Sequence, residues 1–158
     1  MEDIYLDRKV DTEEIGKKLH NLFPSLSVFY YDFKDIPPTD LDIENSNQIF
    51  FNTYYQKEKL EFGFTISIYR TPDENSNERA MFIAKSFSDS FKVRTLVPYI
   101  LPQNPQDPYY DIIFDNGKIF LADDCSTSFG DDTDGIIKII KEYNLNIYSF
   151  DSYAKMSY

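Results

Sequence analysis

The sequence predicts an α+β fold, with a mostly antiparallel sheet of about five to seven strands and two or three helices packed on one face. Residues 60–70 alternate between apolar and polar side chains, which is typical of a strand with one buried face. Asn116-Gly117 separates two apolar runs and favours a tight hairpin. Two further segments place apolar residues at helical spacing. A chain of 158 residues is expected to form a single domain, residues 1–158.

The first element is expected to be a helix over residues 12–23. Asp11 is a good N-cap, and Glu14 follows three residues later, as in a capping box. The apolar residues at helical spacing are Ile15, Leu19, Leu22 and Phe23. Pro24 ends the helix, and the aromatic run over residues 26–33 predicts a strand.

The middle of the chain predicts a strand pair and a second helix. Residues 48–55 and 60–70 are expected to pair as antiparallel strands. Asn77 is the expected cap of a helix that ends near Phe91, although a strand over residues 81–84 stays open as an alternative. Residues 93–100 predict a strand, whose end Pro98 confines to a sheet edge.

The last third predicts a hairpin, a helix and a strand. Residues 109–114 and 118–123 are expected to pair as a hairpin around Asn116-Gly117. This dipeptide favours a type I′ turn, because both turn positions require positive φ. A helix over residues 133–143 is expected, capped by Asp132 and buried through Ile136, Ile140 and Tyr143. Residues 146–150 predict the last strand.

Charge and aromatic content are the most informative features of the composition. The chain has 27 acidic and 16 basic residues, a net charge of -11, together with 13 Tyr, 14 Phe and no Trp. An acidic surface suits a basic partner and disfavours direct contact with nucleic acid, because phosphates repel it. The same acidity is also explained by simple solubility. Both interpretations stay open at this point.

Cellular location is predicted from the cysteine count and the N-terminus. The single Cys125 excludes an internal disulfide and favours a reducing compartment. The acidic start lacks the run of about 7–15 apolar residues of a secretory signal, and no run reaches the roughly 18 of a membrane span. A cytoplasmic protein is therefore expected.

No motif in the sequence indicates catalysis, a cofactor or a bound metal. His20 is the only histidine, and Cys125 directly follows two aspartates, which disfavour a reactive thiolate. There is no phosphate-binding glycine loop and no zinc-ligand spacing. The EF-hand template fails because Gly130 would take its first ligand position and Lys141 its twelfth. The expectation is therefore a protein that is not an enzyme.

Two acidic loops are the predicted partner-binding segments. Fixed carboxylates beside exposed aromatic side chains can fill a basic cleft, and aromatic anchors often dominate such interfaces. The first loop supplies Asp35, Asp40, Asp42 and Glu44. The second supplies Asp123, Asp124, Phe129, Asp131, Asp132 and Asp134. We expect these residues to contact a basic protein partner.

In size, acidity and the absence of a catalytic motif, the chain resembles the small acidic immunity proteins of bacterial toxin competition systems. The resemblance concerns the whole chain and no single motif, so it assigns no role to any residue. It implies a cytoplasmic protein that blocks a basic toxin domain, often a nuclease. Two alternatives stay open: a nucleic-acid mimic that inhibits a DNA- or RNA-binding protein, and a metal-dependent hydrolase that uses the Asp-rich loop 123–134.

Overall fold

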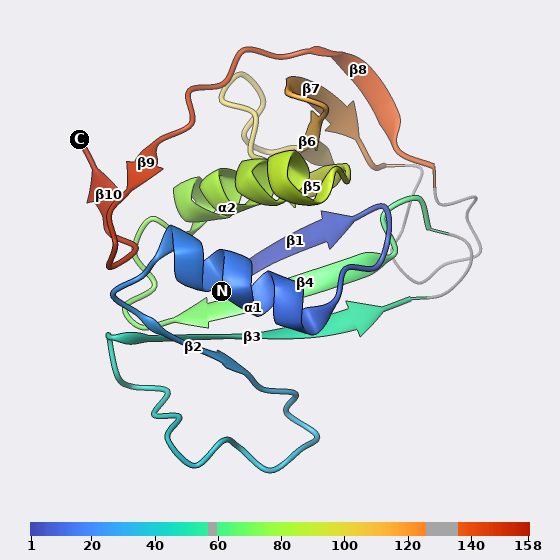
Figure 1. The fold of residues 1–158 in the computed structure, drawn as a ribbon. Coiled ribbons are helices and arrows are strands. Elements are labelled where there is room, and N and C mark those ends of the chain that lie inside the picture. Colours follow the sequence, from blue (N-terminus) through green and yellow to red (C-terminus); the bar gives the residue numbers. More distant parts are fainter. Residues whose placement is uncertain (57–59, 126–135) are drawn as a thin grey trace.

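A long sheet with two helices on one face dominates the structure (Figure 1). The computed structural model describes residues 1–56, 60–125 and 136–158. Within these residues the sheet has eight strands in the order β2-β3-β4-β1-β5-β6-β7-β8, and only β2 and β3 pair in parallel. The predicted α+β architecture, with a mostly antiparallel sheet and helices packed on it, is thereby confirmed.

The longest connection between successive elements is the one from β2 to β3, residues 31–47. The helices are α1 (Thr12–Leu22) and α2 (Ser76–Phe91). The strands of the large sheet are β1 (Glu2–Leu6), β2 (Ser27–Tyr30), β3 (Gln48–Tyr55), β4 (Phe64–Arg70), β5 (Thr95–Pro98), β6 (Tyr110–Asp115), β7 (Lys118–Asp123) and β8 (Lys138–Glu142). A separate two-stranded hairpin consists of β9 (Ser149–Phe150) and β10 (Met156–Ser157).

The main core lies between the helices and the sheet. In β4 every second residue from Phe64 to Arg70 is buried, as the alternation of residues 60–70 predicts. Ile15 and Leu19 of α1 and Phe87 of α2 are fully buried against this face. Burial of such side chains is worth about 1.5–3 kcal/mol each, so the amphipathic helices are held on the sheet mainly by apolar packing.

Several predicted element boundaries are confirmed closely. Helix α1 covers residues 12–22, with Asp11 accepting a hydrogen bond from the Glu13 backbone N–H at 2.8 Å, and β3 covers residues 48–55. Helix α2 excludes the alternative strand over residues 81–84, although its cap position is Asn75 rather than Asn77. The Asn116-Gly117 turn has φ of 51° and 82°, as a type I′ hairpin requires.

The predicted helix over residues 133–143 is wrong. Residues 133–135 lie outside the described residues, and residues 138–142 form strand β8, which pairs antiparallel with β7. The repeated isoleucines fit helical and strand periodicity equally, and β-branched side chains favour the strand. The predicted strand over 146–150 shortens to β9.

Strand β1 at the N-terminus was not anticipated from the sequence. It lies between β4 and β5 in the centre of the sheet, where Glu2, Ile4 and Leu6 are buried. The Glu2 carboxylate forms a fully buried ion pair with Arg79 of α2, and burial raises the pKa of Glu2 although Arg79 opposes the shift. Glu2 can therefore take a core position because Arg79, although distant in the sequence, supplies a buried counter-charge.

The opposite side of the sheet carries no helix among the described residues, and we call it the helix-free face. Its side chains are those that alternate with the main-core residues, such as Asp3 and Tyr5 in β1. A smaller apolar cluster covers the β5–β7 part of this face and comprises Phe62, Leu96, Ile113, Ala122 and Ile137. This face therefore mixes apolar and acidic groups.

Candidate functional site

Residues 31–47 form a long connection from β2 to β3, which we call the acidic loop. Figure 1 shows that it extends away from the body of the molecule beside the edge strand β2. The four acids predicted here to bind a partner are all exposed: Asp35, Asp40, Asp42 and Glu44. No ion pair between described residues involves any of them. Their charges are thus available to a partner.

Side-chain hydrogen bonds fasten the acidic loop to the rest of the chain. The Gln48 side chain accepts from the Asp42 backbone N–H at 2.7 Å and donates to the Asp40 carbonyl at 2.9 Å. The Asp42 carboxylate accepts from the Glu44 N–H at 3.0 Å, and Thr71 of the neighbouring turn donates to the Ile43 carbonyl at 3.0 Å. These bonds fix the backbone that carries the acids, so less conformational entropy is lost on binding.

Apolar side chains accompany the acids of this loop. Ile36 is 92% exposed, and Phe33 and Ile43 are each 56% exposed. The ring of Phe33 packs edge-on against Tyr69 at 5.4 Å, and Tyr69 in turn stacks on Phe50 at 4.7 Å. The loop therefore starts on an aromatic cluster of the helix-free face and presents an isolated apolar side chain, Ile36, between carboxylates.

The second predicted acidic segment is only partly described. Phe129, Asp131, Asp132 and Asp134 lie outside the described residues. Asp123 accepts a hydrogen bond from the Cys125 N–H at 2.7 Å, and hydrogen bonds from Cys125 lower the pKa of Asp123. The Asp124 N–H donates to the Tyr109 carbonyl at 2.9 Å. Both carboxylates are half-buried at the end of β7.

The structure does not bring the two predicted segments together. The acidic loop leaves from β2 at one edge of the sheet, whereas Asp123 is the last residue of β7, six strands away in the sheet order, and Asp124 follows it. With a strand spacing of about 4.8 Å, this is a lateral separation of roughly 29 Å. The two segments therefore form separate acidic regions.

A pair of facing carboxyl groups, Asp111 and Asp124, was missed by sequence reasoning. Asp111 of β6 is only 2% exposed. Oδ2 of Asp111 and Oδ1 of Asp124 are both buried without a hydrogen-bond partner among the described residues. Burial, together with the charge of Asp124, raises the pKa of Asp111 to about 8. Burial also raises the pKa of Tyr5, to about 12, with Asp3, Asp111 and Asp124 adding to the shift. The only signal for this pair in the sequence is that Asp111 lies inside a predicted apolar strand.

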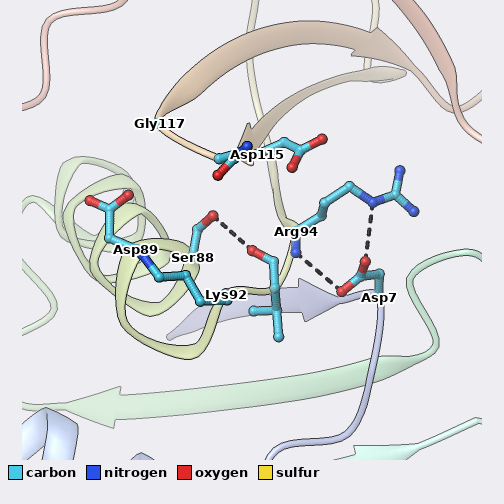
Figure 2. A pocket seen from close by; sticks show the side chains of 9 residues that line it. Asp7, Ser88, Asp89, Lys92, Arg94, Asp115 and Gly117 are labelled. Atoms are coloured by element: carbon cyan, nitrogen blue, oxygen red, sulfur yellow. Dashed lines mark hydrogen bonds and ion pairs between the residues drawn. The ribbon is translucent and has the colours of Figure 1, made fainter.

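A polar cavity of about 530 Å³ lies where α2 ends, beside the β6–β7 turn (Figure 2). Arg94 donates from Nε to Asp7 at 3.1 Å and from Nη1 to Glu61 at 2.8 Å. Lys92, Asp89 and Asp115 also line this cavity. Because its acids face two cations of the same chain, it offers a partner less uncompensated charge than the acidic loop does.

Other candidate groups take up no arrangement typical of a catalytic or metal site. His20 and Cys125 are both exposed; His20 lies in α1, whereas Cys125 lies in the connection after β7. Residues 1–56, 60–125 and 136–158 contain no group of three or more His, Cys, Asp or Glu side chains that could hold a metal ion. No helix in these ranges is long and apolar enough to cross a membrane. The metal-dependent hydrolase stays a prediction, since most of its proposed loop is not described.

Comparisons with protein-family models, curated proteins and solved structures find no match to this chain.

Proposed function

We propose that this protein binds and neutralises a basic protein partner, in the manner of an immunity protein that inhibits a toxin domain. The observation that carries the proposal is the acidic loop, whose four carboxylates are exposed, unpaired with any described cation and mounted on a hydrogen-bonded backbone. The net charge of -11 acts in the same direction. A basic partner would be the complementary surface.

Charge and apolar contact have different roles in this proposal. Exposed ion pairs contribute only about 0.2–1 kcal/mol each, so the carboxylates mainly speed encounter with the partner and select its sign of charge. Affinity requires desolvated anchors near the centre of the contact. Ile36, at 92% exposure, and the half-exposed Phe33 are the apolar side chains that the loop offers for this purpose.

The test compares two variants with the same change in net charge. The loop variant carries Asp35→Asn, Asp40→Asn, Asp42→Asn and Glu44→Gln, which keep the side-chain carbonyls that accept the loop's hydrogen bonds. The control variant carries Glu13→Gln, Glu14→Gln, Asp89→Asn and Glu142→Gln, four exposed acids on the helices and on β8. Both are tested for binding to the purified product of the adjacent gene and for protection of cells that express it.

The wild type and the control are expected to bind and protect, with association that weakens as salt increases. The loop variant is expected to lose most of its association rate. Equal binding and protection by all three proteins, at every salt concentration, would refute the electrostatic role of the loop. Failure of the wild type itself to bind or protect would refute the proposed partner.

The same reagents address the nucleic-acid-mimic alternative. A mimic occupies the nucleic-acid cleft of its target, so it competes with DNA or RNA for the bound partner. An immunity protein that binds beside the active site leaves nucleic-acid binding intact while activity is lost. A filter-binding assay with the partner and labelled nucleic acid separates the two outcomes.

A further inference from the structure

The Asp111–Asp124 pair presents two buried acceptor oxygens that the described chain leaves without a donor. Oδ2 of Asp111 and Oδ1 of Asp124 have no hydrogen-bond partner, and Asp111 is 98% buried because only 2% of its surface is exposed. No ion pair between described residues involves either side chain. A buried acceptor without a donor costs roughly 1–3 kcal/mol, and more when it is charged.

The titratable groups of the described residues that act on the pair are acidic or neutral. Strand β1 contributes Tyr5, and Asp3 beyond it; β7 contributes Asp123; and the connection before β6 contributes Asp107. Lys138 of β8 acts on Asp123 rather than on the pair. Asp3 itself accepts a hydrogen bond from Ser67 at 2.6 Å. Among the described residues, the surroundings thus supply no cation to balance the two carboxylates.

Two adjacent carboxyl groups in such a place can be neutralised in two ways. They can share one proton, so that one acid donates to the other, or a cation can lie against both. A lysine ammonium or an arginine guanidinium supplies several donors at once and would satisfy both orphaned oxygens. Both orphaned oxygens are buried, and Asp124, which is half-buried directly after β7, is the more exposed member of the pair, so a cationic side chain would have to enter from its side.

We propose that Asp111 and Asp124 form a recognition site for a single lysine or arginine side chain, which replaces the proton that the two carboxyl groups share. This inference rests on the proposed function, because it assigns the site to a side chain of the same basic partner. It is separate from the acidic loop, because β6 and the end of β7, which carry the pair, lie roughly 24–29 Å from β2 across the sheet. The partner would therefore contact two regions of the sheet.

Proton release is the measurable consequence of this exchange. The raised pKa of Asp111, about 8, means that the free pair holds a proton at neutral pH, which a bound cation expels. Binding that releases one proton strengthens about tenfold for each pH unit as the pH rises towards about 8, and levels off above it. Cations that bind elsewhere on the acidic surface would lack this dependence.

The experiment uses three short, end-blocked peptides that differ in one residue, a lysine, an arginine or a glutamine. Binding is followed by NMR through the side-chain carboxyl carbons of Asp111 and Asp124 across a pH series at constant ionic strength. Variant Asp111→Asn removes one carboxylate of the site. The matched control, Asp115→Asn, removes one charge from the same strand at its other end, where Asp115 pairs with Lys118.

The lysine or the arginine peptide is expected to bind saturably, to lower the apparent pKa of the pair and to show the tenfold dependence on pH. The Asp115→Asn control should keep these effects, and Asp111→Asn should lose them. The inference is overturned if neither cationic peptide saturates the pair, if the glutamine peptide acts equally, or if Asp111→Asn binds like the wild type.

Failure of the site and failure of the proposed function give different results. If the adjacent gene product binds the wild type and Asp111→Asn equally, without proton release, the proposed function stands and this site is excluded. If the cationic peptides bind the pair but no basic partner is neutralised, the site stands and the proposed function is excluded.

Discussion

Replacing Asp111 by Asn should stabilise the protein at neutral pH. The folded protein holds the carboxyl group of Asp111 at a pKa of about 8, whereas its ordinary value is 3.8. Asn has the same shape and its amide N–H can donate to Oδ1 of Asp124, which lacks a partner. The substitution therefore supplies permanently the donor that the shared proton supplies only while it is bound.

The magnitude follows from proton linkage. Below pH 3.8 the folded and unfolded chains both hold the Asp111 proton, and the full stability is present. Between 3.8 and about 8 only the folded chain keeps it, so the free energy of unfolding falls by about 1.4 kcal/mol per pH unit. Over the roughly 3 units up to pH 7 the loss reaches about 4 kcal/mol, a large share of a typical 5–15 kcal/mol.

The assay is urea unfolding of the wild type, Asp111→Asn and the Asp115→Asn control at a series of pH values. The Asp111→Asn variant should match the wild type near pH 4 and exceed it progressively up to about pH 8, by as much as about 4 kcal/mol at pH 7. The control should parallel the wild type. A stability difference between Asp111→Asn and the wild type that does not change with pH would refute the reasoning.

Three further substitutions test the fold, each by urea or thermal unfolding. Glu2→Gln should cost about 3–5 kcal/mol, because it removes the buried carboxylate that pairs with Arg79 and leaves only the exposed Asp73 at 3.7 Å, while the double variant Glu2→Leu/Arg79→Met should cost less. Gly63→Ala should cost about 1–3 kcal/mol, because the added Cβ would lie 2.7 Å from the Gln56 carbonyl oxygen. Gly117→Ala should cost about 1–2 kcal/mol, because φ at this turn position is +82° and the site is otherwise open. Losses below 0.5 kcal/mol at any of the three would contradict the corresponding argument.

Local signals predicted the elements whose interactions are local. The hairpin depends on the backbone freedom of two adjacent residues, Asn116 and Gly117, and α1 depends on Asp11 and a stripe of apolar side chains. Strand β8 shows the limit of such signals. Its isoleucines suit either periodicity, and the choice is made by hydrogen bonds to β7, with a bulge that removes strict alternation.

The two features that the sequence hid both involve charged residues in buried positions. Glu2 occupies a core position in β1 because Arg79 reaches it from α2, 77 residues later. Asp111 becomes notable only because β6 and the end of β7 place Asp124 against it. In both cases the sequence shows only an acidic residue, a type that is usually exposed, so without knowledge of its partner the side chain is assigned to the solvent-exposed side.

The separation of the acidic regions constrains how a partner could use them. The separation of roughly 24–29 Å across the sheet is about three times the Debye length of about 8 Å at physiological ionic strength, so charges in one region hardly affect the other. Substitutions in the acidic loop and at Asp111 should therefore change the binding free energy additively, within about 0.5 kcal/mol. A strongly non-additive result would require the partner, or a rearrangement of this chain, to couple the two regions. Additivity would instead indicate a partner that contacts the two regions independently. In that case the acidic loop speeds encounter, and the carboxyl pair binds one cationic side chain.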